Sequence, residues 1–145
     1  MSGSLIVFEG LDQSGKQTQA EMLRDRLKGE GHKARLESFP DYATSIGEEI
    51  ARALQGEREY GPDVMQLLYV ANRYERKPDL QRWLDGGLIV LCDRYERDLA
   101  LQARVRGSYL RQAAEQNWVQ LDGERPKHLI AADVLNAVES RLWPP

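Results

Sequence analysis

The sequence predicts an α/β fold in three layers, with a parallel β-sheet flanked by helices. Two short apolar runs, residues 5–9 and 88–92, have the pattern of buried strands. Segments with apolar residues at helical spacing lie between these runs and after them. Strands that alternate with helices are typical of a parallel sheet, because each crossover between parallel strands needs a long connection.

Each predicted element follows from a local pattern and from the glycine or proline that ends it. The first strand is a continuous apolar run, which indicates burial on both faces of the sheet. Pro78 should kink or divide its helix, because proline lacks an N–H group and clashes with the preceding turn. In chain order the sequence predicts a strand at 5–9, a helix at 16–30, a strand at 33–39, helices at 46–54 and 63–85, a strand at 88–92, a helix at 96–117, a strand at 118–121 and a helix at 129–142.

Composition indicates one ordinary domain spanning residues 1–145, with 41% apolar residues, 30% charged residues and a net charge of −3. A chain of this length can bury a core without disulfides or metals. Cys92 is the single cysteine, which excludes an intrachain disulfide and favours a cytoplasmic location. The first apolar run is too short for a signal peptide or a membrane span. Basic residues are scattered, which argues against nucleic-acid and membrane partners and leaves a local site for any bound anion.

The most specific motif lies between the first strand and the first helix. Residues 10–17 read Gly-Leu-Asp-Gln-Ser-Gly-Lys-Gln, which matches a phosphate-binding loop in the required setting. Glycines let backbone N–H groups point at phosphate oxygens, and the helix start adds the positive end of its dipole. The alternative, a glycine-rich turn with an exposed lysine, is disfavoured by this setting. The predicted phosphate-binding residues are Gly10, Asp12, Gln13, Ser14, Gly15, Lys16, Gln17 and Thr18.

Asp93 and Arg94 form the second candidate cluster, directly after the buried strand at 88–92. Ligands of parallel sheets bind at the carboxyl ends of the strands, and phosphate-loop enzymes hold Mg²⁺ there with a carboxylate. Asp93 is therefore the predicted metal-binding residue, and Arg94 can neutralise charge on a phosphoryl group. The alternative is an ordinary ion pair at a strand end. The Ser or Thr that usually follows the loop lysine and coordinates Mg²⁺ is replaced by Gln17, before Thr18.

Four segments resemble the thymidylate kinase family in order and spacing: LIVFEGLDQSGKQTQ (5–19), SFPDYATSIGEEI (38–50), LLYVANRYERK (67–77) and VLCDRY (90–95). The resemblance implies a P-loop NTPase fold and a transferase that moves the γ-phosphoryl group of ATP to dTMP with Mg²⁺. The products would be dTDP and ADP, in pyrimidine deoxynucleotide synthesis. It also implies a homodimer formed through helices, for which the apolar residues at 67–74 are candidates, although a core position explains them equally well.

The resemblance also assigns roles to individual residues. Asp12 matches the carboxylate on the 3′-hydroxyl side of the acceptor, and Tyr69 matches the ring that stacks on thymine. Arg73 matches the arginine that reads the base, and Tyr95 matches the aromatic residue that packs on the sugar and disfavours a 2′-hydroxyl. Together the implied catalytic residues are Lys16, Asp93, Arg94 and Asp12, and the implied dTMP-binding residues are Asp12, Pro40, Tyr69, Arg73, Arg94 and Tyr95.

The sequence departs from the family pattern in two places. Tyr42 replaces the arginine of the family's Phe-Pro-x-Arg, so that one acceptor-phosphate contact is missing or comes from another arginine. After Tyr95 the family's next block, with one strand and an arginine-bearing lid, is absent. Loss of that strand would open a gap of about 10 Å between its neighbours. Either the strand at 118–121 closes up beside the strand at 5–9, or the protein contains residues that this chain lacks.

These departures leave two alternative functions open. Gln17, Tyr42 and the absent lid are compatible with a nucleotide-binding module that shows little or no turnover. A nucleoside monophosphate kinase with another base preference is the second alternative, which a substrate panel would separate from a thymidylate kinase.

Overall fold

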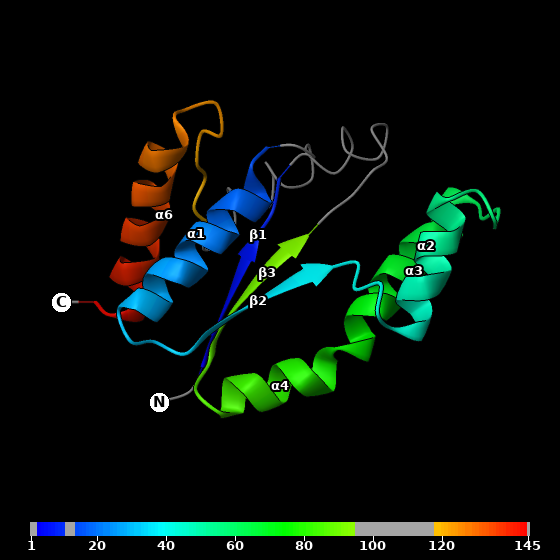
Figure 1. Cartoon of the computed structure of the whole chain (residues 1–145), viewed down its shortest axis with the longest axis horizontal. Coiled ribbons are helices and arrows are strands. Elements are labelled where there is room, and N and C mark those ends of the chain that lie inside the picture. Colours follow the sequence, from blue (N-terminus) through cyan, green and yellow to red (C-terminus); the bar gives the residue numbers. More distant parts are fainter. Residues whose placement is uncertain (1–2, 11–13, 95–117, 145) are drawn as a thin grey trace.

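The computed structural model describes residues 3–10, 14–94 and 118–144 (Figure 1). The predicted helix at 96–117 and the predicted site residues Asp12, Gln13 and Tyr95 lie outside the described residues. The described elements are, in order, β1 (Ser4–Phe8), α1 (Lys16–Gly29), β2 (Ala34–Phe39), α2 (Ser45–Leu54), α3 (Pro62–Glu75), α4 (Lys77–Asp85), β3 (Ile89–Arg94) and α6 (Lys127–Leu142).

The three described strands form a parallel sheet in the order β1-β3-β2. In its register Ile89 of β3 is level with both Ser4 and Ala34, so the carboxyl ends of the strands meet at one edge. Helices α1 and α6 lie on one side of this sheet and α4 lies on the other (Figure 1). The predicted three-layer α/β arrangement is therefore confirmed.

Each face of the sheet has its own apolar core, because successive side chains of a strand point to opposite faces. The larger core joins the sheet to α1 and α6, and the smaller one joins it to α4. The buried residues are Leu23, Leu27, Ala34, Ile89, Leu91, Ile130 and Val134 in the first core, and Phe39, Val90 and Cys92 in the second.

The predicted burial of the first strand on both faces is wrong. Ile6 and Phe8 pack against the core beneath α1 and α6, whereas Leu5 and Val7 are 50% and 49% exposed. In the described part of the chain β1 pairs with β3 alone, and the α4 side chains of the smaller core pack on β2 and β3. A strand buried on both faces needs a core on each side, and among the described residues β1 contributes to the larger core alone.

The predicted strand at 118–121 is also wrong, because these residues form neither a strand nor a helix. Val119 and Leu121 are largely exposed, and β1 has no hydrogen-bonded neighbour there. A short apolar alternation forms a strand only where a partner strand satisfies its backbone groups. The alternative in which this segment closes up beside the first strand is therefore excluded.

The other predicted elements agree with the structure. The helical pattern at 63–85 is divided as Pro78 predicted, since α3 ends at Glu75 and α4 begins at Lys77 with its proline in the first turn. The predicted elements at 16–30, 33–39, 46–54, 88–92 and 129–142 correspond to α1, β2, α2, β3 and α6.

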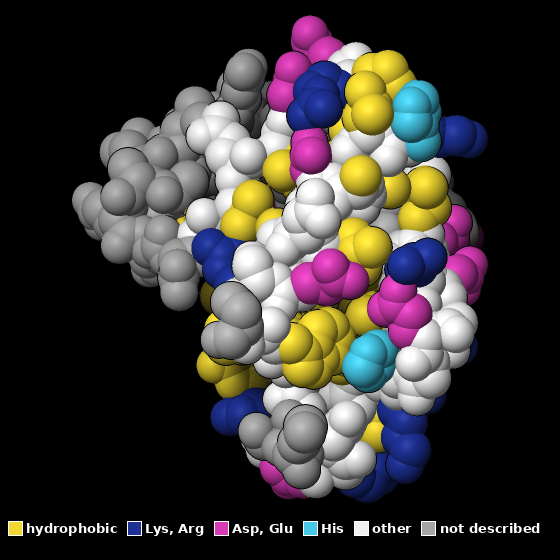
Figure 2. Space-filling model, turned by 90° about the vertical axis from the view of Figure 1, so that its left-hand side faces the viewer, with side chains coloured by type: hydrophobic (Ala, Val, Ile, Leu, Met, Phe, Trp, Pro, Cys, Tyr) yellow, Lys and Arg dark blue, Asp and Glu magenta, His cyan; other side chains and the backbone are white. Residues whose placement is uncertain are grey.

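Helix α6 packs along α1 and forms an outer face of the molecule. Figure 2 shows acidic, basic and hydrophobic side chains interspersed over this side. At the end of the helix, the Trp143 ring stacks on the His32 ring with 4.5 Å between their centroids. This contact fastens the end of α6 to the connection between α1 and β2. None of the helices described is long and apolar enough to cross a membrane.

Candidate phosphate-binding site

Helix α1 begins at the carboxyl end of β1, and its N-terminus carries no side-chain cap. Gly15 precedes the helix with φ 83°, a left-handed conformation that glycine adopts without a steric penalty. The first turn contains no acidic residue, and a helix begins with N–H groups that lack partners within the helix. An anion at this position would accept hydrogen bonds from these groups and be stabilised by the helix dipole.

The backbone conformation at Gly15 can be tested through stability. We expect Gly15→Ala to lower the free energy of unfolding by about 1–2 kcal/mol, because a left-handed residue with a Cβ is strained. A Cβ at this position meets no atom within 4 Å, so the backbone alone accounts for the loss. Gly29→Ala is the matched control. It also meets open space, at the other end of the same helix, and should stabilise by up to about 1 kcal/mol. Urea denaturation measures the stability of both variants, and equal effects would contradict the left-handed conformation of Gly15.

Asp93 occupies the same edge of the sheet, near the end of β3, and is only 6% exposed. Its Oδ1 atom is buried and has no hydrogen-bond partner among the residues that the structure describes. Burial raises the pKa of this carboxyl group, while the positive charge of Lys16 and the backbone N–H of Arg94 act in the opposite direction. A buried oxygen without a partner costs about 1–3 kcal/mol, which a bound cation or an ordered water would recover. The charge of Lys16, at the start of α1, therefore acts on the Asp93 carboxyl group at the end of β3.

Arg94 points to the opposite face of the sheet from Asp93. Its Nη1 atom lies 3.5 Å from Glu9 Oε1, in an ion pair that joins the ends of β3 and β1. Both side chains are mostly buried, at 24% and 14% exposure. The alternative in which Asp93 and Arg94 form an ordinary surface pair does not hold, because Asp93 is buried and the described partner of Arg94 is Glu9. Sequence patterns assigned no role to Glu9, whose carboxylate pairs with the Arg94 guanidinium at the strand ends.

Gln17 and Thr18 are the described residues of this motif that were predicted as alternative oxygen ligands for a metal. The Gln17 amide donates to Glu21 Oε1 at 3.0 Å, one turn further along α1, and Thr18 is exposed. Among the residues that the structure describes, no group of three or more His, Cys, Asp or Glu side chains could hold a metal ion. Mg²⁺ prefers oxygen ligands and usually keeps several waters and substrate phosphates. Asp93 alone, with its unpartnered oxygen, fits that kind of site.

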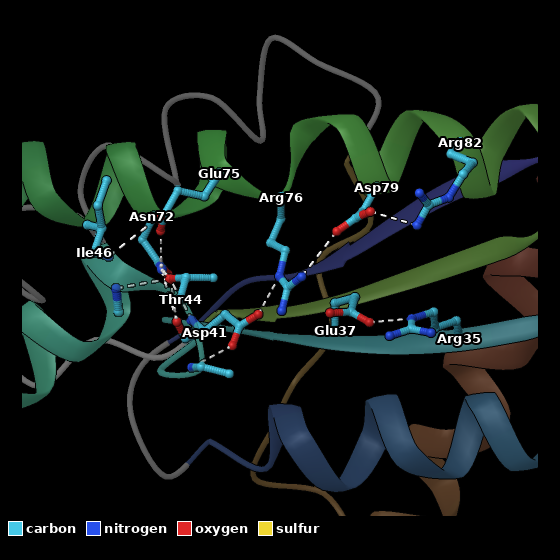
Figure 3. Close-up of polar contacts among 12 residues, drawn as sticks. Arg35, Glu37, Asp41, Thr44, Ile46, Asn72, Glu75, Arg76, Asp79 and Arg82 are labelled. Atoms are coloured by element: carbon cyan, nitrogen blue, oxygen red, sulfur yellow. Dashed lines mark hydrogen bonds and ion pairs between the residues drawn. The ribbon is translucent and has the colours of Figure 1, made fainter.

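The predicted acceptor residues lie across the same edge of the sheet, on α3 and on the loop after β2. Tyr69 and Arg73 are half-buried and one turn apart on α3. Pro40 is buried at the start of the loop, and Tyr42 is 44% exposed. Asn72 of α3 is hydrogen-bonded to this loop through Asp41 (Figure 3). The structure therefore joins the two predicted acceptor segments, and it does so through a residue to which the sequence assigned no role.

Comparison with known proteins gives the family of this chain. The family model for thymidylate kinase matches residues 8–97, more than half of the sequence. The chain belongs to the thymidylate kinase family. The Arabidopsis thaliana thymidylate kinase is 41% identical over 93 residues, which cover 64% of this chain and 35% of that protein.

Two solved thymidylate kinases resemble the structure. The Candida albicans enzyme has a TM-score of 0.59 and 28% identity, over 94% of this chain and 57% of that one. The Ehrlichia chaffeensis enzyme has a TM-score of 0.76 over 96% of this chain and 99% of that one, at 20% identity, which supports the fold alone. The fold is that of the P-loop NTPases. The chain spans between 35% and 47% of the length of the curated relatives it matches.

Proposed function

We propose that this chain is a thymidylate kinase that transfers the γ-phosphoryl group of ATP to dTMP, giving dTDP and ADP. The observation that carries the proposal is the site at the start of α1 in a member of this family. There the charge of Lys16 acts on a buried Asp93, whose Oδ1 atom has no partner in the described part of the chain. The free buried thiol of Cys92 supports a reducing, cytoplasmic location.

Phosphoryl transfer depends on positioning and charge neutralisation more than on covalent chemistry. The N–H groups at the start of α1 would bind the β- and γ-phosphates of ATP, and the Lys16 ammonium would neutralise them. Arg94 would stabilise charge on the transferring group from the opposite side of β3. Mg²⁺ would supply further neutralisation of the phosphate oxygens, and Asp93 is the described carboxylate placed to hold it.

The acceptor would lie between the strand ends and α3. Tyr69 offers a ring for stacking on the base, and Arg73 offers a guanidinium on the same side of the helix. Pro40 lines the other side, on the loop after β2. The roles assigned to Asp12, Gln13 and Tyr95 remain predictions, since these residues lie outside the described part of the chain.

A substrate panel tests the proposal. ADP formation is followed with ATP and Mg²⁺ and with dTMP, dCMP, dGMP or AMP as the acceptor. A thymidylate kinase should give a rate with dTMP well above the other three. A higher melting temperature with ATP or dTMP but no ADP would instead indicate a binding module without turnover. A faster reaction with another acceptor would indicate a kinase of different base preference.

We also propose that the chain forms a homodimer through α3. Leu67 and Tyr74 are 68% and 66% exposed, and Val70 between them is 39% exposed. Residues spaced three and four apart share one side of a helix, so these side chains form one exposed apolar stripe. Such a stripe is more typical of an interface than of a solvated helix face.

Leu67→Glu should therefore convert a dimer into a monomer, because it places a charge within the apolar contact. Leu129→Glu is the matched control, since Leu129 is also exposed, at 40%, but lies on α6. Light scattering coupled to gel filtration gives the mass of each variant. The proposal fails if the unaltered chain is monomeric, or if both variants remain dimeric.

A further inference from the structure

The loop between β2 and α2 is held at Asp41, where all four polar atoms have partners (Figure 3). The Asp41 backbone N–H donates to Asn72 Oδ1 at 2.8 Å, and its carbonyl oxygen accepts from Asn72 Nδ2 at 3.0 Å. Its Oδ1 atom accepts from the N–H of Ala43 at 3.0 Å, and its Oδ2 atom pairs with Arg76 Nε. Residue 41 is therefore fixed by contacts from α3 and from the start of α4.

The Asn72 side chain is fully buried, with 0% exposure, although it is polar. Besides its two bonds to Asp41, its Nδ2 atom donates to Thr44 Oγ1 at 2.8 Å and lies 3.3 Å from Glu75 Oε2. A buried amide without these partners would be costly, so each bond constrains the loop. All of these loop contacts join residues about thirty positions apart in sequence.

The other side of the loop is held by the first turn of α2. Thr44 caps this helix by accepting from the N–H of Gly47 at 3.0 Å, and it donates to the carbonyl oxygen of Asp41 at 3.0 Å. Gly47 packs so closely that a Cβ there would come within 1.7 Å of that carbonyl oxygen. The loop is thus enclosed between α2 and α3 by contacts within the protein.

We propose that Asn72 is a positioning residue for the phosphoryl acceptor, which it orders by fixing the loop at 40–44 against α3. The proposal rests on the proposed function. Tyr69 is three residues before Asn72 and Arg73 directly follows it, so one helix presents the base-binding pair and holds the loop. The Asn72 side chain is fully buried behind the loop, which leaves it no surface for a substrate to contact. Its effect on the acceptor passes through Asp41, which lies between Pro40 and Tyr42.

Asn72→Asp tests the proposal. The carboxylate keeps the size of the side chain but lacks the Nδ2 donor, and it adds a negative charge near Asp41 and Glu75. We expect the Kd of dTMP to rise by at least about tenfold while the Kd of ATP stays within about twofold, as measured by calorimetry. Hydrogen exchange at the Asp41 amide should accelerate by about tenfold or more, because the new carboxylate is repelled by the Asp41 carbonyl oxygen that Asn72 Nδ2 binds, and the loop then separates from α3. Asn136→Asp, the same change at an exposed position of α6, is the matched control and should alter none of these values.

The two readouts separate the possible failures. Faster exchange at Asp41 with an unchanged Kd of dTMP would overturn the positioning role, and so would an equal rise in the Kd of both nucleotides. If the unaltered chain binds ATP but not dTMP, the proposed function itself fails, and the acceptor role with it. Should Asn72→Asp not fold, Thr44→Val removes one acceptor of the Asn72 amide without adding charge. A rise in the Kd of dTMP without a rise in the Kd of ATP would then support the positioning role, and equal values would overturn it.

Discussion

Replacing Lys16 by alanine is expected to lower the rate of ADP formation by about 10²- to 10³-fold, the usual cost of removing one electrostatic contact to a transition state. Lys16 follows Gly15 at the start of α1 and is the cation that acts on the buried Asp93 carboxyl group. Its loss removes charge neutralisation from the phosphates of ATP. It also lets the pKa of Asp93 rise further, which disfavours the ionised form that binds a metal.

Lys28→Ala is the matched control for this experiment. Lys28 lies in the last turn of the same helix and is exposed, so its removal changes the net charge equally without touching the site. Steady-state kinetics and calorimetry with ATP measure both variants. Unchanged ATP binding in Lys16→Ala, or an equal loss in Lys28→Ala, would show that the helix start is not the phosphate site.

The parts of this structure that the sequence predicts are those encoded by neighbouring residues. The start of α1 directly after Gly15 is one example, since Gly15 ends the turn before the helix and Lys16 is its first residue. The break between α3 and α4 is another, because Pro78 acts on its own helix. The position of Asp93 also follows from a local rule, that a residue after a buried parallel strand lies at the ligand-binding edge.

The parts that the sequence did not predict depend on distant partners. Leu5 and Val7 have the composition of a buried strand, but their exposure depends on whether another element covers that face of the sheet. The segment at 118–121 has the alternation of a strand without a described neighbour to pair with. Asn72 interrupts the apolar pattern of its helix, which is the one local sign of a role. Its bonds to Asp41 span 31 residues and follow only from the fold.

Asp93→Asn is expected to abolish most of the Mg²⁺-dependent turnover and, at the same time, to stabilise the ligand-free protein at neutral pH. The loss of turnover follows because a neutral amide binds Mg²⁺ far more weakly than a carboxylate does. The gain in stability follows because the Asp93 Oδ1 atom is buried with no partner among the described residues, and burial raises the pKa of its carboxyl group. Ionising this group therefore costs more in the folded protein than in the unfolded chain.

The sign of the pH dependence follows from this difference. Below the ordinary pKa of an aspartate, about 3.9, Asp93 is protonated in both states and contributes no penalty. As the pH rises from there through the raised pKa of the folded state, the unfolded chain ionises first, so the wild-type protein loses stability relative to Asp93→Asn. Above that range the difference in stability between the two proteins is constant. Urea denaturation of both proteins between pH 4 and pH 8 measures it.

With Mg²⁺ and ATP present, the wild-type protein should become more stable than Asp93→Asn. Ligands that bind only the folded state stabilise it, and the wild-type protein is expected to bind these more tightly. Asp85→Asn, at the exposed end of α4, is the matched control and should follow the wild-type curve. A variant that is less stable than the wild type at every pH would mean that the Asp93 carboxylate has a partner within the protein. The Asp93 carboxylate would then lower the stability of the ligand-free protein and also bind the metal. That combination is expected of a functional residue rather than a structural one.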